Sequence, residues 1–247
     1  SMTSTTTKNG RYGNQLIRNI AVSLLAEKFN LNVSYSSTED TNRLGINLFS
    51  GEKIYDQSII LNGDNYFEIL NSKDTIESNL DPNNAYFQTK EIINKIYEFL
   101  HREDIMHSVM QHNPFKERYN NNNDVYVHIR LGDVKSKNPG LDYYIKALET
   151  TDFENLYISS DNPTHKIITE IKRKYRNCKK IEVIDYGKIK TIQFASTCKN
   201  IVLSHGTYSS LIGYLAYFSN VSYPFYDKET AWCGEIFNIK DWKEINF

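Results

Sequence analysis

The sequence lacks the features that mark several large classes of protein. It has three cysteines, Cys178, Cys198 and Cys233, an odd number too widely spaced for a C-x-x-C metal motif. A disulfide framework is therefore not expected, and a reducing compartment fits best. No apolar run approaches the roughly 20 residues that span a bilayer, and no charged and then apolar signal segment is present. We expect a soluble cytoplasmic protein without a signal peptide or a membrane span.

An excess of charge of one sign is also missing. The chain carries 29 basic and 30 acidic residues, which leaves no net field to steer it toward nucleic acid or anionic lipid. No nucleic-acid partner is expected, and an anionic ligand would have to be bound by a few placed groups. The sequence shows no clear D-x-D motif and no cluster of histidines and carboxylates at metal-ligand spacing, so we also expect no metal.

The first half of the chain contains two helical patterns and little regular structure between them. A chain of 247 residues and 28.8 kDa can form one large domain or two of roughly 120 residues. Apolar residues at helical spacing predict a helix over residues 14–29 and a second, long helix from Thr89 to about Met110. Strands are predicted at 31–35 and, weakly, at 58–61.

A polar run separates the two halves. Residues 116–124 read "KERYNNNND" and have no periodic pattern, so they are interpreted as a linker. This interpretation divides the chain into an N-terminal α/β domain, residues 1–122, and a C-terminal domain, residues 123–247.

The second half alternates strand-like and helical runs. Strands alternating with helices of about 10 to 15 residues predict a parallel sheet wound by right-handed crossovers, that is, a Rossmann-like domain. The predicted strands are 125–129, 156–159, 181–185, 201–204 and 221–225, and the predicted helices are 141–150, 163–175, 188–199 and 207–218.

Polar motifs follow three of these strands. They read "HIRLGD" from His128 to Asp133, "SSDN" from Ser159 to Asn162, and "SHGTYSS" from Ser204 to Ser210. In sheets of this kind, ligands bind at the carboxyl ends of the strands. We therefore expect the three motifs to meet at one crevice.

Each motif also has a structural interpretation. Arg130 offers a planar cationic fork suited to phosphate, but it could instead pair with Asp133. Asp161 could accept hydrogen bonds from a base or ribose, or it could be the N-cap of the helix that follows Pro163. The stretch 207–210 offers hydroxyls and backbone N–H groups to an anion, or Thr207 could cap the helix. His205 alone would more often be an ordinary loop histidine than a catalytic one.

The opening stretch "GRYGNQL" is a glycine turn at the head of the first helix. Gly10-x-x-Gly13 matches neither the G-x-G-x-x-G fingerprint nor a Walker loop, so the dinucleotide and ATP motifs are absent. Asn14 and Gln15 place two side-chain amides at a helix N-terminus, which suits sugar hydroxyls or phosphate oxygens. The alternative is a plain turn glycine before a helix.

Taken in order, "GRYGNQL", "VHIRLGD" and "SHGTYSSLIGYLA" resemble the motif series of the α-1,2-fucosyltransferases, of the glycosyltransferase family 11 type, and of their α-1,6 and O-fucosyltransferase relatives. The family pattern has G-x-x-G-N-Q, H-x-R-R-G-D and a Ser-rich and Asn-rich third stretch. Leu131 replaces the second arginine of H-x-R-R-G-D, His205 stands where the family has Asn, and Ser210 and Leu211 replace a Trp pair. The resemblance thus leaves the acceptor and the linkage open.

The resemblance implies a GT-B architecture of two Rossmann-like domains that face each other across a cleft. It implies a GDP-fucose donor held mainly by the C-terminal domain, a glycan acceptor, an inverting reaction and no metal or other cofactor. The implied catalytic residues are Arg130, His128 and Asn14. The implied donor-binding residues are Arg11, Gly13, Gln15, Asp133, Asp161, His205, Gly206, Thr207, Tyr208, Ser209 and Ser210.

In such a reaction, negative charge develops on the departing GDP, and a base must take the acceptor proton. Arg130 and the amides of residues 207–210 would neutralise that charge, but no residue of the sequence is a convincing base. A nucleotide-sugar-binding protein without catalysis and a protein O-fucosyltransferase-like enzyme stay open as alternatives. A nicotinamide-dependent oxidoreductase is disfavoured because its glycine fingerprint is absent.

Overall fold

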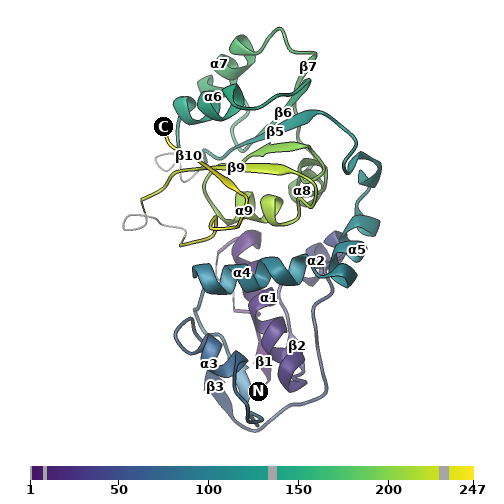
Figure 1. Cartoon of the computed structure of the whole chain (residues 1–247). Helices are drawn as coiled ribbons and strands as arrows, with labels where there is room; N and C mark the ends of the chain where they lie inside the picture. Colours follow the sequence, from purple (N-terminus) through teal and green to yellow (C-terminus); the bar gives the residue numbers. More distant parts are fainter. Residues whose placement is uncertain (1, 8–9, 133–137, 228–233) are drawn as a thin grey trace. The chain divides into compact units, whose positions relative to one another are not determined.

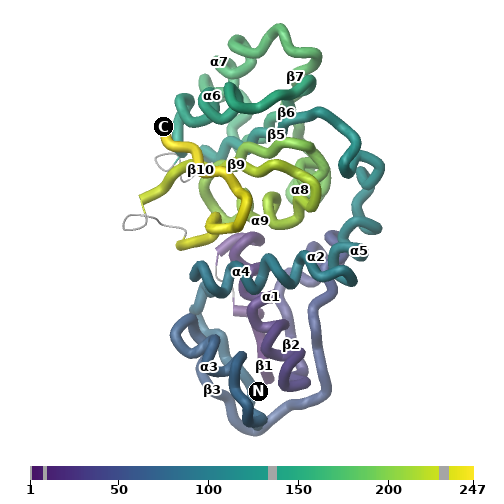
Figure 2. The backbone as a smooth tube through the Cα atoms, viewed as in Figure 1, coloured from purple at the N-terminus to yellow at the C-terminus, as the bar shows by residue number. Residues whose placement is uncertain are grey.

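The chain forms two compact units (Figures 1 and 2) in a computed structural model that describes residues 2–7, 10–132, 138–227 and 234–247. The first unit comprises Ser1–Val109 together with Gly234–Ile236, and the second comprises Met110–Cys233 together with Phe237–Phe247. The main division therefore lies 13 residues before the expected domain boundary at residues 122 and 123.

The second unit is built on a six-stranded parallel sheet. Its order is β10-β9-β8-β5-β6-β7. Numbered from β5, this order reads 3-2-1-4-5-6 from β7 to β10, which is the order of doubly wound dinucleotide-binding sheets. The strands are β5 (Asp124–Ile129), β6 (Asn155–Ser160), β7 (Lys180–Val183), β8 (Asn200–Val202), β9 (Asn220–Pro224) and β10 (Lys243–Ile245).

Helices cover both faces of this sheet (Figure 1). The helices α6 and α7 contact each other, and so do α8 and α9. Their bounds are α6 (Leu141–Glu149), α7 (Lys166–Lys174), α8 (Lys188–Ala195) and α9 (Thr207–Tyr214). The predicted parallel, Rossmann-like α/β sheet is confirmed for this unit. The strand β10 was not predicted, because two of its three residues, Lys243 and Glu244, are exposed and charged.

The first unit has shorter strands. The strands β1 (Thr3–Ser4) and β2 (Val33–Ser34) form one parallel pair, and β3 (Ser58–Ile60) and β4 (Asn79–Asp81) form another. Among the described residues of this unit, the two pairs are separate sheets, so a second continuous sheet is not present there. The helices of the unit are α1 (Tyr12–Phe29), α2 (Thr38–Leu44), α3 (Tyr66–Leu70), α4 (Lys90–Leu100) and the greater part of α5 (Glu103–His112).

The helix α1 is the core of the first unit. Residues around its whole circumference are buried, including the polar side chains Arg18, Asn19 and Ser23. A helix buried on all sides is typical of the interior of a domain. The buried polar groups bind the neighbouring loops: Asn19 Nδ2 donates to Ser36 O at 2.9 Å, and its Oδ1 accepts from the hydroxyl of Thr5 at 2.5 Å.

The prediction of a single helix from Thr89 to about Met110 is wrong. The chain forms two helices, α4 and α5, which are interrupted at His101 and Arg102. The guanidinium of Arg102 pairs with Asp104 in the first turn of α5 and with Glu27 of α1. Carboxylates are favoured at a helix N-terminus, so Glu103 and Asp104 begin a new helix where apolar spacing alone indicated a continuous one.

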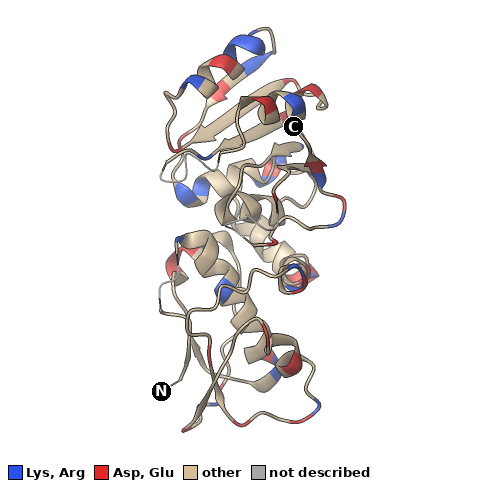
Figure 3. Ribbon diagram, turned by 90° about the vertical axis from the view of Figure 1, so that its left-hand side faces the viewer, with Lys and Arg blue, Asp and Glu red and all other residues tan. Residues whose placement is uncertain are grey.

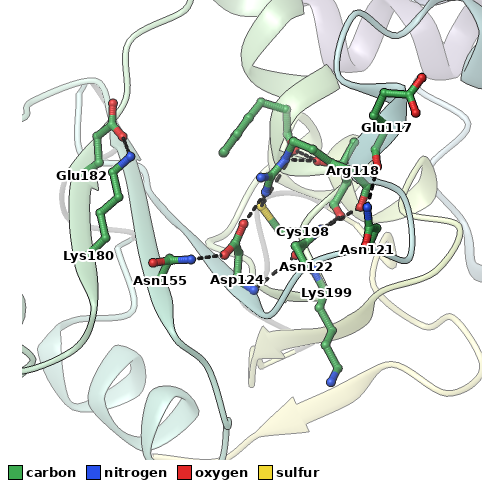
Figure 4. A network of polar contacts seen from close by, with 12 residues as sticks. Glu117, Arg118, Asn121, Asn122, Asp124, Asn155, Lys180, Glu182, Cys198 and Lys199 are labelled. Carbon is green, nitrogen blue, oxygen red and sulfur yellow. Dashed lines mark hydrogen bonds and ion pairs between the residues drawn. The ribbon is translucent and has the colours of Figure 1, made fainter.

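The segment 116–124 is anchored rather than a loose linker. Within it, residues Lys116–Arg118 form a short 3-10 helix, and Arg118 Nη2 lies 2.5 Å from Asp124 Oδ2. Asn155 Nδ2 donates to the other carboxylate oxygen of Asp124 at 2.7 Å, and Asn122 Nδ2 donates to Thr197 O at 2.9 Å. Figure 4 shows this network. It ties the segment to the amino ends of the sheet and so makes it part of the second unit.

In the part of the chain that the structure describes, no helix is both long enough and apolar enough to cross a lipid bilayer.

We expect Arg118→Met to destabilise the second unit by about 2–3 kcal/mol. Asp124 is only 3% exposed, and the loss of one partner of a buried ion pair leaves an uncompensated charge. The free energy of unfolding should be measured in urea from the fluorescence of the two tryptophans, Trp232 and Trp242, which both belong to the second unit.

Lys174→Met is the matched control, because its ion pair with Glu149 is about half exposed and should contribute less than about 1 kcal/mol. Equal losses in both variants would show that the Asp124 network does not anchor the segment.

Candidate functional site

The strands β5 and β8 are neighbours at the point where the strand order of the sheet reverses. They pair in parallel through Val125 with Asn200, Tyr126 with Ile201 and Val127 with Val202. The chain leaves β5 toward α6 and leaves β8 toward α9, and these helices belong to opposite faces (Figure 1). Ligands of doubly wound sheets bind at this switch point, beyond the carboxyl ends of the strands. The described part of the first motif, residues 128–132, therefore lies beside the motif "SHGTYSS", as expected for these two motifs.

Ser204 holds the two strand ends together. Its hydroxyl oxygen accepts from the backbone N–H of Arg130 at 3.4 Å and from the hydroxyl of Tyr144 at 3.0 Å. Its own N–H donates to Ser209 Oγ at 2.8 Å, and Tyr143 of α6 donates to Leu203 O at 2.5 Å. Ser204 and both tyrosines are fully buried. The loop after β8 is thus fixed before any ligand arrives.

The N-terminus of α9 has no side-chain cap. Gly206 is the N-cap, with φ of 101°, so the interpretation of Thr207 as the cap is wrong. Ser210 N–H donates to Gly206 O at 3.1 Å, and the three preceding N–H groups have no partner within the helix. A helix N-terminus of this kind is a ready anion site.

The hydroxyls of Ser209 and Ser210 serve the loop itself. Ser209 accepts from Ser204, and Ser210 Oγ donates to Thr207 O at 2.9 Å. Both side chains are fully buried. The backbone amides are therefore the groups of this stretch that suit an anion, together with the partly exposed Thr207.

The same arrangement begins two more helices at this edge of the sheet. The helix α6 begins after Gly140, with φ of 91°, and α8 begins after Gly187, with φ of 82°; neither has a side-chain cap. The hydroxyl of Tyr208 donates to Lys188 O at 2.6 Å, which places the first turns of α8 and α9 next to each other.

His128 is a buried, neutral imidazole at the end of β5. It is 7% exposed, and its ring centroid lies 5.5 Å from that of Tyr208. Burial, together with the charge of Arg130, lowers the pKa of His128 to about 3. Among the described residues, its Nδ1 has no hydrogen-bond partner. His128 is therefore a weak proton acceptor at neutral pH, but it can take part in one hydrogen bond with a ligand.

Arg130 is half-buried and has a fixed backbone. In addition to its bond to Ser204, its carbonyl oxygen accepts from Asn138 Nδ2 at 2.8 Å. Its charge is, after burial, the second cause that lowers the pKa of His128. The alternative pairing of Arg130 with Asp133 stays untested, because Asp133 lies outside the described residues.

Asp161 clamps the loop after β5. Its Oδ1 accepts from Leu131 N–H at 2.7 Å, and a Cβ at Gly132 would come within 2.3 Å of its Oδ2. Gly132 thus admits the close approach of this carboxylate. The interpretation of Asp161 as the N-cap of α7 is wrong, because His165 is that cap and its Nδ1 accepts from Ile167 N–H at 3.1 Å.

The glycine turn of the opening motif belongs to the first unit. Gly10 has φ of 76°, and the N-cap of α1, Arg11, makes no side-chain cap. Gln15 Nε2 donates to Gly10 O at 3.0 Å, and its amide oxygen accepts from the hydroxyl of Ser37. The side-chain oxygen of Asn14 accepts from Gln88 Nε2 at 2.8 Å. The amide oxygens of Asn14 and Gln15 therefore position loops, and Gly13 is buried within the helix.

Two residues that the sequence analysis did not single out support this turn. Arg18 is 1% exposed, and its guanidinium donates to Ala85 O at 2.5 Å and to Thr7 O at 3.5 Å. Phe87 is buried with φ of 59°, a strained conformation for a bulky residue, and it precedes Gln88. Arg18 could have been noticed in the sequence, because it is a charged residue inside the apolar stripe of the helix predicted over residues 14–29.

The described residues contain no group of three or more His, Cys, Asp or Glu side chains that could hold a metal ion. In comparisons with known proteins, no family model and no curated protein matches the chain. The case for a function therefore rests on the residues at the strand ends.

We expect the buried His128 to make the second unit less stable in acid. Its folded-state pKa of about 3 lies below the roughly 6.5 of an unfolded histidine, so the folded state binds fewer protons. The imidazole of His128 therefore leaves the free energy of unfolding unchanged above about pH 6.5, and it lowers this free energy as the pH falls from 6.5 toward 3.

Between pH 7 and pH 5, the loss of unfolding free energy should be about 2 kcal/mol smaller in His128→Gln than in the parent. Urea unfolding at both values of pH gives the comparison. His107→Gln, at an exposed position of α5, serves as the control. The same pH dependence in parent and His128→Gln would contradict the assignment of a neutral imidazole.

Proposed function

We propose that this protein is a metal-independent, inverting glycosyltransferase that moves fucose from GDP-fucose to a sugar hydroxyl, with an α-1,2 linkage as the expected product. The observation that carries the proposal is the meeting of Arg130, the neutral His128 and the uncapped N-terminus of α9 at the switch point between β5 and β8. A cation beside free backbone N–H groups suits a diphosphate.

The choice of fucose and of GDP rests on the resemblance of the three motifs to the fucosyltransferases. A GT-B arrangement, with the acceptor bound by the first unit, is part of this proposal. Arg11, Gly13, Asn14 and Gln15 would then act from that unit, and Asp161, His205, Gly206, Thr207, Tyr208, Ser209 and Ser210 would form the donor site of the second.

In the proposed reaction, the acceptor oxygen bonds to C1 of fucose while the bond from C1 to the phosphate oxygen breaks. The electron pair of that bond stays on GDP, and the acceptor proton passes to a base. Arg130 and the N–H groups of Thr207, Tyr208 and Ser209 would stabilise the charge on the departing diphosphate. With a pKa of about 3, His128 is a poor base and is better suited to a hydrogen bond with the donor.

A nucleotide-sugar-binding protein without catalysis is the second candidate. The observation that favours it is the low pKa of His128, about 3, which leaves the residues assigned to the site without an effective base for the acceptor proton. Such a protein would bind GDP-fucose without releasing GDP, whereas a transferase would release it in the presence of an acceptor.

GDP should raise the melting temperature of the protein, and UDP should not. A ligand that binds only the folded state, present at about 100 times its dissociation constant, adds roughly 2.7 kcal/mol to the free energy of unfolding. Thermal unfolding should be followed with each nucleotide in a buffer that contains EDTA, because the proposed site needs no metal. Equal stabilisation by UDP would contradict the choice of donor.

Arg130→Ala should lower the turnover of GDP-fucose by about 10²–10³, by analogy with the loss of one donor to a developing oxyanion. Arg130→Lys should not restore turnover, because lysine keeps the charge but lacks the planar fork. Transfer or donor hydrolysis gives the rate, and calorimetry gives the affinity for GDP.

The control is Arg173→Ala, which replaces an exposed arginine of α7. This variant should leave the turnover of GDP-fucose and the affinity for GDP unchanged. Turnover of Arg130→Ala close to that of the parent would exclude a catalytic role. A fall in melting temperature without GDP would instead indicate a structural ion pair.

A further inference from the structure

The near-neutral net charge of the chain hides an uneven distribution between the units. The first unit carries 10 basic and 15 acidic residues, a net charge of −5, and the second carries 19 basic and 15 acidic residues, a net charge of +4. Although the whole chain is almost neutral, each unit therefore carries a net charge of its own. A local excess of positive charge attracts anionic partners within about a Debye length, roughly 8 Å at physiological salt.

Much of the positive charge of the second unit lies on α7 and the residues after it. This α7 basic surface consists of Lys166, Lys172, Arg173, Lys174, Arg176, Lys179 and Lys180, which are all exposed. Figure 3 shows the blue segments of α7 at the top of the view. Between residues 165 and 180, Glu170 is the one acidic residue of the sequence.

Few of these charges are neutralised within the unit. Lys174 Nζ lies 2.9 Å from Glu149, and Lys180 Nζ lies 3.1 Å from Glu182. In the part of the chain that the structure describes, the other five side chains of the surface make no ion pair. They are available to an external anion.

The opposite side of α7 faces the core. Ile168 and Ile171 are buried in the cluster that also contains Leu148 and Ile158. The ring of Tyr175 packs against Phe153, with centroids 5.6 Å apart, and its hydroxyl oxygen is buried. The helix therefore presents cations to solvent and keeps its apolar and aromatic groups inside.

We propose that the α7 basic surface docks the protein onto an anionic membrane through phospholipid headgroups. Clusters of four to eight Lys and Arg on a helix bind anionic lipid by electrostatic attraction, and five of these seven residues are lysines, which are compact point charges. Binding is peripheral and reversible, because no apolar side chain of α7 is free to enter the acyl chains.

Single-stranded nucleic acid is a poorer match to this surface. Proteins that bind it combine basic grooves with exposed aromatic rings on which bases stack. Tyr175, the aromatic residue of this segment, is turned inward. This proposal does not depend on glycosyl transfer, since the surface lies outside the residues assigned to the donor.

The test is co-sedimentation of the full chain with vesicles of phosphatidylcholine that contain about one third phosphatidylserine, compared with pure phosphatidylcholine. At about 0.1 M salt, the protein should sediment with the anionic vesicles only, and about 0.5 M salt should release it. Equal sedimentation with both vesicles, or binding that salt does not weaken, would overturn the proposal.

Two variants locate the surface. K166Q/K172Q/R173Q/R176Q removes four of its charges and should weaken vesicle binding by at least about tenfold. K116Q/K199Q/K240Q/K243Q removes four exposed lysines elsewhere in the second unit and should keep most of the binding. Equal losses would mean that overall charge, not this surface, binds the lipid.

Melting temperature and GDP affinity, measured for both variants, should match those of the parent and so separate lost docking from lost folding. Fluorescence anisotropy with a single-stranded RNA oligonucleotide completes the test. RNA binding that is tighter than vesicle binding and disappears in K166Q/K172Q/R173Q/R176Q would overturn the membrane proposal in favour of nucleic acid.

Discussion

The pairing of β5 with β8 is the interaction on which the rest of the second unit depends. It spans three residue pairs, and it joins the first strand of the sheet to the strand that the chain adds fourth. The crossovers on the two sides of this pair run to opposite faces, and in doubly wound sheets the ligand binds where such loops diverge. Without this pair, the two motifs would belong to separate half-sheets.

The two ends of the strands have different roles. At the amino ends, Asp124 accepts hydrogen bonds from Arg118 and Asn155, and these bonds tie the preceding segment to the sheet. At the carboxyl ends, the first N–H groups of α9 have no capping side chain, and His128 is buried without a partner at Nδ1 among the described residues. One edge of the sheet supplies stability, and the other keeps polar groups available for chemistry.

The sequence was sufficient for β5 to β9 and for α6 to α9, because apolar periodicity and burial agree there, but it did not indicate β10. The meeting of residues 128–132 with the motif "SHGTYSS" could also be inferred, since parallel strands end at one edge. The roles of single polar residues could not. The hydroxyls of Ser209 and Ser210 bind atoms of their own loop, and Asp161 accepts from a backbone N–H at another strand end. Those partners are distant in sequence, and no local pattern encodes them.

The first unit was harder to predict for a related reason. Its strands are two or three residues long. The predicted strands 31–35 and 58–61 overlap β2 and β3, but β1 and β4 were not predicted, because runs as short and polar as Thr3–Ser4 and Asn79–Asp81 show no apolar alternation. Hydrogen bonds from buried polar groups replace apolar contacts there, as when Thr3 Oγ1 accepts from Leu80 N–H at 2.9 Å. The break between α4 and α5 likewise depends on Glu27, about 75 residues away from Arg102.

The glycines that begin α6, α8 and α9 have a consequence for how this protein can evolve. Around Gly140 and Gly187, no atom lies within 4 Å of the place where a Cβ would stand, so space does not restrict these positions. The backbone conformation restricts them instead, because positive φ values near 90° disfavour every L-amino acid that carries a side chain. Gly140 and Gly187 should therefore vary little among descendants of this sequence, although both lie at the surface of a unit where substitution is otherwise easily accommodated.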